Sequence, residues 1–469
     1  MSNAISSLAD TEQQHDAQKR PLVEKWFPRF GYASAEIGTI LIFEIISSYL
    51  GLYYTDAVGL APAIVAALML IVRIIQSVGT PIAGNIIDRT KSRFGLCRPW
   101  LLWGLPFLVV LSILTFTTVG HTTVTKVLWA GFTYICLSVV FTMVDTAKGT
   151  LVNTISADMN ERVVLNSYRS MGSSVGRLVL SGITMPLILF FGNGARGYFT
   201  TNLIFAIATI PFLLFAFVAC KEHVAVAPDA PKITVKESLV SLMRNSQLLW
   251  FVLFNLVATG ATLWRVSIST YYYIYSVERP DLVSPMLMAF TAGQFIPPLI
   301  VPFILKYFSK KTALMFGSIM QGVILIAMHF TPYDNVVLIG VLTFMFGVSM
   351  MGSIIGFSAC SDCIEYDYYR NGRRMPGTVV GAVSLSVAAG MAIGGSLGMF
   401  LLGVVGYHKG VVMDMAMRSN ISLVVNLIPG IIMIAGIVIL IPYKLSNKRM
   451  LEIQEANKLK DDAIESDVA

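Results

Sequence analysis

Long runs of apolar residues, separated by short polar segments, recur along the whole chain. The runs fall near residues 31–55, 60–87, 100–119, 126–153, 166–191, 200–220, 247–275, 283–306, 312–331, 335–361, 377–406 and 420–443. Each is long enough to cross about 30 Å of hydrocarbon, which takes about 20 helical residues. The runs are too long, and alternate too weakly, for the strands of a membrane β-barrel. The pattern therefore predicts an all-α integral membrane protein with twelve transmembrane helices.

The twelve runs form two groups of six, which predicts a two-part organisation. The expected parts are a cytoplasmic N-terminal tail (1–28), an N-terminal six-helix bundle (29–220), a cytoplasmic linker (221–246), a C-terminal six-helix bundle (247–443) and a cytoplasmic C-terminal tail (444–469). The basic segments DRTKSRFG and YFSKKTALMFG follow the second and the eighth run, at equivalent positions of the two halves. Such an internal repeat is a common plan of secondary transporters.

Composition and charge agree with a membrane protein. The chain is 55% hydrophobic and 13% charged, too few polar residues to cover a soluble core. The net charge of +7 is explained by basic loops on one side of the membrane, without nucleic acid as a partner. Those loops hold Arg89, Lys91, Arg93 and Arg98; Arg162; Lys221, Lys232, Lys236 and Arg244; Lys306, Lys310 and Lys311; and Arg370, Arg373 and Arg374. This bias predicts a multi-pass protein of the cell inner membrane with both termini cytoplasmic, inserted without a cleaved signal peptide because residues 1–25 are polar.

Several segments resemble catalytic or cofactor motifs but lack the context that each motif needs. The stretch GNGARG (192–197) matches G-x-G-x-x-G, yet it follows a membrane helix rather than a strand. Cys360 and Cys363 form a C-x-x-C without a second pair to complete a zinc site. No Walker, H-E-x-x-H or G-x-S-x-G motif occurs in the sequence. We therefore expect no enzyme activity, no cofactor and no metal site.

Ionisable residues inside the apolar runs are the sharpest functional signal, because each is costly there and normally faces the interior of a helix bundle. They are Glu36 and Glu44 in the first run; Arg73, beside Gln76, in the second; Asp145 and Lys148, in line with Thr142, in the fourth; Arg169 and Arg177, in line with Ser173, in the fifth; and Arg265 in the seventh. The alternative for each is a structural ion pair or a side chain that snorkels to the surface. Lys148 has a possible partner in Asp145, three residues earlier. The tyrosines at 271–273 are interpreted as an interfacial aromatic belt.

Five ordered segments resemble one known family. They are YYTDAVGL (53–60), RIIQSVGTPIAGNIIDRTKSRFGLCRPW (73–100), Asp145 with ADMNERVVLNSYR (157–169), SDCIEYDYYRNGRRMPG (361–377) and AIGGSLGMFLLGVVGY (392–407). Together they resemble the glycoside–pentoside–hexuronide:cation symporters, melibiose-permease-like members of the major facilitator superfamily. The resemblance implies a central sugar site between two bundles and alternating access. By position it implies sugar binding by Asp145, and family counterparts for Glu36, Arg73 and Arg169.

The departures from this family concern its cation and sugar sites. The acids that bind the cation on its second helix are replaced here by Gln76 and Thr80. A lysine of its eleventh helix falls at Ala388, a sugar-contacting acid at Ile40 and an aromatic platform at Gly149. Hard cations prefer several oxygen ligands with carboxylate charge, so these replacements favour a proton over sodium as the coupling ion.

The interior bases Lys148, Arg177 and Arg265 are additional to the family pattern and favour an anionic, sugar-like substrate such as a uronide or sulfonate. The expected substrate-binding residues are Asp145, Lys148, Arg169, Arg177, Arg265, Gln76 and Ser384. The expected coupling residues are Glu36, Glu44 and Asp145, and the expected gate residues are Asp88, Arg89, Arg93, Arg98, Asp362 and Glu365. A neutral-glycoside symporter or uniporter, an anion exchanger, a lysolipid or amphiphile transporter of this fold, and a transport-inactive sensor are the alternatives.

Overall fold

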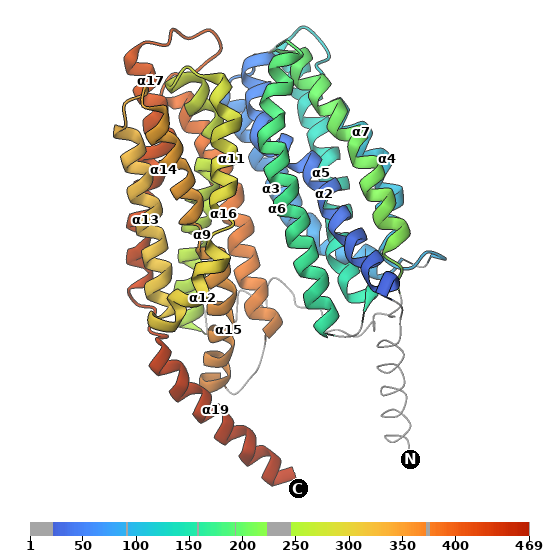
Figure 1. Cartoon of the computed structure of the whole chain (residues 1–469), viewed down its shortest axis with the longest axis vertical. Coiled ribbons are helices and arrows are strands. Elements are labelled where there is room, and N and C mark those ends of the chain that lie inside the picture. Colours follow the sequence, from blue (N-terminus) through green and yellow to red (C-terminus); the bar gives the residue numbers. More distant parts are fainter. Residues whose placement is uncertain are drawn as a thin grey trace. The chain divides into compact units, whose positions relative to one another are not determined.

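A computed structural model describes residues 22–90, 92–156, 159–192, 194–222, 245–371 and 376–468, and every regular element in these ranges is helical (Figure 1). The elements of the first half are α2 (Leu22–Leu52), η1 (Tyr53–Ala57), α3 (Pro62–Asp88), α4 (Arg98–Thr115), α5 (Thr123–Ile155), α6 (Met159–Phe190) and α7 (Ala195–Ala219). The fold class expected from the sequence is thereby confirmed. Most of the expected N-terminal tail and linker lies outside the described residues, so the expected domain bounds stay a prediction.

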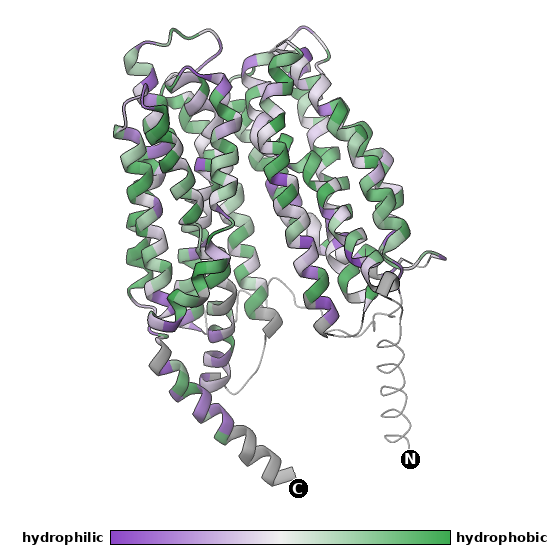
Figure 2. Ribbon diagram, in the orientation of Figure 1, coloured by the Kyte–Doolittle hydropathy of each residue, from purple (hydrophilic) through white to green (hydrophobic). Residues whose placement is uncertain are grey.

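The second half contains more breaks than the first. Its elements are α9 (Ser246–Ser267), α10 (Ser269–Tyr271), η2 (Tyr272–Ser276), η3 (Pro280–Leu282), α11 (Val283–Gly293), α12 (Pro297–Tyr307), α13 (Lys310–Phe330), α14 (Val336–Val348), α15 (Gly352–Asn371), α16 (Pro376–Val404), α17 (Met415–Ser422), η4 (Leu423–Leu427), α18 (Ile428–Gly436), η5 (Ile437–Leu440) and α19 (Asn447–Val468). The last of these is a charged helix, in contrast to long apolar helices such as α13 and α16 (Figure 2).

Among the described residues, 11 helical segments are long and apolar enough to cross a membrane, and each coincides with one of the apolar runs in the sequence. The exception is the tenth run, where α14 has 13 residues and covers only about 20 Å at 1.5 Å per residue. This helix stops at Ser349–Met351 and continues as α15, so two helices in series replace one continuous span. The chain is a multi-pass membrane protein.

Helices α11 and α14 pack closely where both are about to end. The backbone carbonyl of Phe344 lies so close to Gly293 that a Cβ atom there would clash, and the carbonyl of Phe290 does the same at Gly347. Gly293 ends α11, and Pro297 opens α12 after a short break, since proline at the first helical turn needs no backbone hydrogen bond. The eighth span is therefore broken too, close to the break in the tenth.

The described chain forms two compact units. The first holds the chain up to Ile46, Val78–Leu180 and Phe190–Ala230, and the second holds Ser47–Ser77, Ser181–Leu189 and the chain from Pro231 onward. The ends of α2, α3 and α6 therefore belong to a different unit from the rest of these helices.

The tyrosines at 271–273 belong to the second unit and are at most 1% exposed. The hydroxyl of Tyr273 lies 3.1 Å from Thr343 Oγ1, and that of Tyr271 lies 2.9 Å from Thr55 Oγ1. The interpretation of this run as an interfacial aromatic belt is wrong, because belt side chains would face the membrane interface.

Candidate functional site

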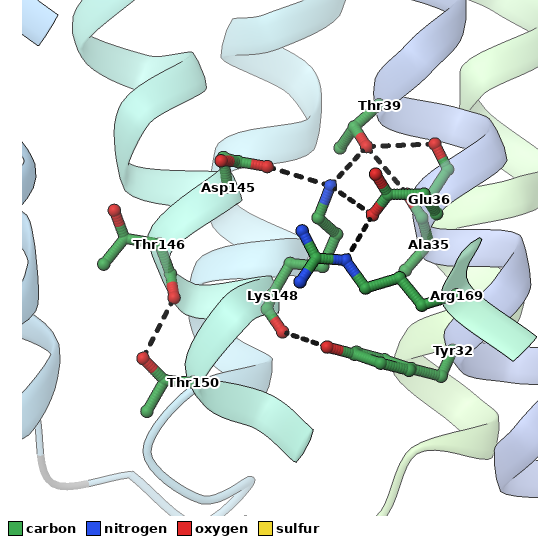
Figure 3. Close-up of polar contacts among 9 residues, drawn as sticks. All are labelled: Tyr32, Ala35, Glu36, Thr39, Asp145, Thr146, Lys148, Thr150 and Arg169. Carbon is green, nitrogen blue, oxygen red and sulfur yellow. Dashed lines mark hydrogen bonds and ion pairs between the residues drawn. The ribbon is translucent and has the colours of Figure 1, made fainter. Parts of the chain in front are cut away.

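An ionic cluster lies within the first unit, where α2, α5 and α6 meet (Figure 3). Its centre is Lys148, whose side chain is 2% exposed. The Lys148 ammonium lies 2.7 Å from Glu36 Oε2 and 2.9 Å from Asp145 Oδ1, and it donates to Thr39 Oγ1 at 2.8 Å. All three donor positions of the ammonium are thereby used, as a buried charge requires.

Arg169 closes the cluster from α6. Its Nε donates to Glu36 Oε2 at 3.0 Å, so that one carboxylate oxygen serves both an arginine and a lysine (Figure 3). The Arg169 side chain remains 35% exposed, and that of Asp145 remains 47% exposed. The cluster therefore has a buried floor, formed by Glu36 and Lys148, and an accessible rim, formed by Asp145 and Arg169.

Local sequence spacing explains half of this geometry. Asp145 and Lys148 are three residues apart on α5, which places them on the same helix face. The contact with α2 needs a close approach of helices instead. A Cβ on Gly172 of α6 would lie 2.5 Å from the carbonyl oxygen of Ala33, so only glycine allows α2 and α6 this separation. Ala33 and Gly172 are each three residues from the residues that pair, Glu36 and Arg169, and so set the distance between them.

Two further residues that the sequence predicted to be functional, Arg177 and Glu44, lie on the same helices as the cluster. Arg177 lies two helical turns beyond Arg169 on α6, and its Nε is buried without a hydrogen-bond partner among the described residues. Glu44 lies two turns beyond Glu36 on α2 and is half-buried. Their predicted roles in substrate binding and coupling stay predictions.

Gln76, Ser384 and Arg265 lie in the second unit, so the described contacts do not join them to the cluster. Gln76 accepts a hydrogen bond of 3.2 Å from Arg73 on the same helix, α3, and Ser384 is exposed on α16. Arg265 is 3% exposed, with the rings of Tyr272, Tyr273 and Phe346 centred 5.9, 5.8 and 6.0 Å from its guanidinium carbon. Their predicted contact with substrate stays a prediction.

The basic segment after α3 is fixed at one end by Arg98. Its Nε and Nη2 donate to the Phe217 carbonyl at 2.9 and 2.6 Å, and its guanidinium lies 4.6 Å from the centre of the Phe217 ring. The Glu222 carboxylate accepts from the backbone amides of Leu96, Cys97 and Arg98 at 2.8–2.9 Å. This carboxylate therefore satisfies free amides at the start of α4.

The other predicted gate residues have separate environments. Arg89 is exposed, Arg93 lies over the ring of Phe94, and the side chain of Asp88 lies outside the described residues. Asp362 on α15 pairs with Lys310 at 2.6 Å, and Glu365 accepts from Asn457 of α19 at 2.9 Å. These last two contacts join α15 to α13 and to α19 within the second unit, and a gate role for any of these residues stays a prediction.

Sequence reasoning missed Thr39, Tyr32 and Asp56. Thr39 is a hydroxyl residue within an apolar run and lies one turn after Glu36. This position could have indicated that its side chain faces the same polar partners as Glu36. Tyr32 donates to the Lys148 carbonyl at 3.3 Å, a contact between helices that no pattern indicates. Within the described ranges no group of three or more His, Cys, Asp or Glu side chains is placed to hold a metal ion.

A multi-pass, all-helical membrane protein with a buried ionic cluster whose rim is accessible has the features of a secondary transporter. Residues 31–447 match the family described as MFS/sugar transport protein, and the chain belongs to that family. This confirms the resemblance to the glycoside–pentoside–hexuronide symporters and identifies the chain as a membrane transporter rather than an enzyme.

Relatives of known description extend over nearly the full chain. A putative glycoside/cation symporter of Escherichia coli is 29% identical over 427 residues, which are 90% of this chain and 92% of that protein. A glucuronide carrier protein homolog of the same organism is 26% identical over 440 residues, 91% of this chain and 94% of that protein. A bacterial homolog of the human lysosomal transporter Spinster has a similar fold, with a TM-score of 0.63 at 12% identity, over 94% of this chain and 98% of that one.

Proposed function

We propose that the chain carries an anionic sugar derivative of the uronide or sulfonate type across the cell inner membrane by alternating access, coupled to protons. The observation that carries this proposal is the state of Arg169. Its Nε is engaged with Glu36, while its side chain is 35% exposed beside Asp145. We infer that the exposed part of Arg169 binds the substrate anion, because the terminal nitrogens of a guanidinium match two oxygens of a carboxylate or sulfonate.

A second arginine of α6 supports the binding of an anionic ligand at the accessible rim formed by Asp145 and Arg169. Arg177 lies on the same face of α6 as Arg169 and has a buried donor nitrogen without a partner among the described residues. A buried cation is stabilised by an anion that reaches it, and two guanidiniums on one helix face favour a negatively charged substrate. The glucuronide carrier homolog, which is 26% identical, is named for a substrate that carries a carboxylate.

Glu36 is the proposed coupling residue because one of its oxygens binds both Lys148 and Arg169. Protonation of Glu36 removes the charge that holds Arg169, which frees the guanidinium for the substrate anion. A proton and an anion would then enter together, and the cluster would keep its net charge. Glu44 and Asp145 are the other proposed proton carriers. Gln76 and Thr80 offer oxygen atoms without carboxylate charge, which supports protons over sodium.

The experiment is thermal stabilisation of the purified protein by pairs of neutral glycosides and matching uronides or sulfonates, with and without sodium, at two pH values. We expect stabilisation by the anions alone, unaffected by sodium. Arg169→Gln should abolish it, whereas Arg196→Gln, a matched change at an exposed arginine, should preserve it. Stabilisation by neutral glycosides, or a clear sodium effect, would contradict the proposal.

Coupling is tested separately in proteoliposomes with an imposed pH gradient. We expect Glu36→Gln to lose proton-driven accumulation while it retains exchange of substrate across the membrane, because exchange needs no net proton movement. Accumulation at the wild-type level in Glu36→Gln would move the coupling role to Glu44 or Asp145.

A further inference from the structure

The first helix of each half ends in the same way. The sequences YYTDAVG (53–59) and YYIYSVE (272–278) share two tyrosines and a valine at equal spacing, and both form a π-helical turn, η1 and η2. Each turn is closed by an amide of the shared valine, Val58 or Val277, which donates to the carbonyl of the first tyrosine at 3.0 Å. Each is followed by a left-handed residue, Gly59 (φ 82°) or Glu278 (φ 59°). The two turns are therefore equivalent elements of the internal repeat.

Asp56 and Tyr275 occupy the same position in these two turns, and they contact each other. The Tyr275 hydroxyl donates to Asp56 Oδ2 in a short hydrogen bond. Asp56 Oδ1 accepts from the Tyr407 hydroxyl at 2.6 Å and from Thr55 Oγ1 at 2.8 Å. Hydrogen bonds to a carboxylate are stronger than those between neutral groups, so three hydroxyl donors stabilise one partly buried negative charge.

The tyrosines around Asp56 also pack on one another. The ring centres of Tyr271, Tyr275 and Tyr407 lie 5.1–6.1 Å apart, and the Tyr271 hydroxyl lies 2.9 Å from Thr55 Oγ1. Burial, and the neighbouring Asp56 carboxylate, raise the pKa of Tyr407 well above its usual value, so its hydroxyl keeps the proton that it donates. Three tyrosine rings thus pack against one another next to Asp56.

This cluster joins the two halves of the sequence inside the second unit, which contains Ser47–Ser77 together with the C-terminal helices. Asp56 comes from the first half, while Tyr275 and Tyr407 come from the second. A carrier that opens alternately on each side must separate its halves at this end, which is the end of α2 remote from the chain's N-terminus. Separation would leave Asp56 with Thr55, its neighbour on the same turn, as its protein donor.

We propose that Asp56, Tyr275 and Tyr407 form a latch that holds this end of the transport path closed and must release for the path to open there. The inference rests on the transport function proposed above, though not on the charge of the substrate. The two partners at the centre of the latch occupy equivalent positions in the two turns. The first half supplies the Asp56 carboxylate, and the second half supplies the Tyr275 hydroxyl. Replacing Asp56 should favour the conformation that is open at this end by removing contacts made only when it is closed.

The experiment measures the distance between spin labels at Thr123 and Asp334, which are exposed beside the first residues of α5 and α14, one in each half. The labels are placed in a full-length chain lacking Cys136, since the other cysteines are buried. We expect Asp56→Asn to increase the population of the longer distance about tenfold or more, because the hydrogen bonds from Tyr275 and Tyr407 lose the charge that strengthens them and one of the two acceptor oxygens. Tyr275→Phe and Tyr407→Phe should each give a smaller increase.

Asp281→Asn and Tyr333→Phe are the matched controls. Asp281 is an exposed acid paired with Arg279, and Tyr333 contacts Tyr272 and Arg418 rather than Asp56. An unchanged distance distribution in Asp56→Asn, or an equal shift in Asp281→Asn, would overturn the latch. If Asp56→Asn does not fold, the two tyrosine variants decide the question, since each keeps the carboxylate. Failure of anions to stabilise the wild type would contradict the proposed substrate and leave this distance measurement interpretable.

Discussion

Lys148 and Arg265 are two buried cations with opposite surroundings. Lys148 is 2% exposed and has two carboxylates within 2.9 Å, those of Glu36 and Asp145. Arg265 is 3% exposed, and in the described part of the chain it contacts a phenol at 3.3 Å, a thioether at 3.5 Å and three aromatic rings, while its Nε is buried without a hydrogen-bond partner there. One charge is balanced by opposite charge and the other by π-electrons.

This difference suggests different roles for the two cations. The partners of Lys148 can change during transport, whereas those of Arg265 hold it in place. A carboxylate can bind a proton or exchange its partner for a substrate group, so the pairing around Lys148 can change during a cycle. An aromatic ring has neither property, and cation–π attraction is worth about 0.5–2 kcal/mol. The cage around Arg265 therefore favours the structural alternative that the sequence left open. The variants below test this contrast.

The largest effect is expected from Lys148→Met. The change leaves Glu36 and Asp145 close together without the ammonium that joins them, and breaking a buried pair costs about 3–5 kcal/mol. We expect a lower unfolding temperature and no substrate transport. Lys221→Met, at an exposed lysine, is the matched control and should resemble the wild type. Wild-type stability in Lys148→Met would show that the cluster does not depend on its central charge.

A steric variant tests the cluster without altering its charges. Gly172→Ala places a Cβ 2.5 Å from the Ala33 carbonyl oxygen, which must push α6 away from α2 and lengthen the Arg169–Glu36 contact. We expect a loss of about 1–3 kcal/mol in stability, together with reduced transport.

The control for this variant lies one turn further along α6. A Cβ at Gly176 would lie 3.4 Å from Ile40 Cγ2, an ordinary contact, so Gly176→Ala should be nearly neutral. Equal effects of the two alanines in unfolding and transport assays would show that the α2–α6 approach does not set the cluster.

Asp145→Asn tests the accessible rim. The Asp145 side chain is 47% exposed, so stability should change by less than about 1 kcal/mol because solvent screens its pairing with Lys148. Substrate affinity should fall about tenfold or more if Asp145 contacts a sugar hydroxyl, since about 1.4 kcal/mol corresponds to a factor of ten. Titration calorimetry measures the affinity, and a dissociation constant within twofold of the wild type would exclude the contact.

The smallest effect is expected from Arg265→Met. Methionine fills a similar volume among the same aromatic rings and removes a buried charge, so stability should stay within about 1 kcal/mol of the wild type. Substrate affinity should change less than threefold. A rise of tenfold or more in the dissociation constant would instead place Arg265 at the substrate and remove the contrast with Lys148.

The sequence was most informative where a property is local. Eleven helical segments of the described chain coincide with apolar runs, because hydropathy over about 20 residues reports directly on membrane insertion. The spacing of Asp145 and Lys148 indicated their pair as one alternative, because residues three apart share a helix face, and the structure contains this pair. The breaks after α11 and α14 were not visible in hydropathy, which stays high through both.

The sequence alone thus determined the helices, the family, and the helix faces on which Glu36, Asp145, Lys148 and Arg169 lie. It left open which buried charges are paired, because Glu36 and Arg169 are 133 positions apart, and their contact depends on the close approach of α2 and α6 at Gly172. Only the tertiary structure showed that Lys148 lies between carboxylates and that Arg265 lies among aromatic rings. The physical reason is that periodicity fixes the direction of a side chain from its own helix, whereas its partner is chosen by how helices pack.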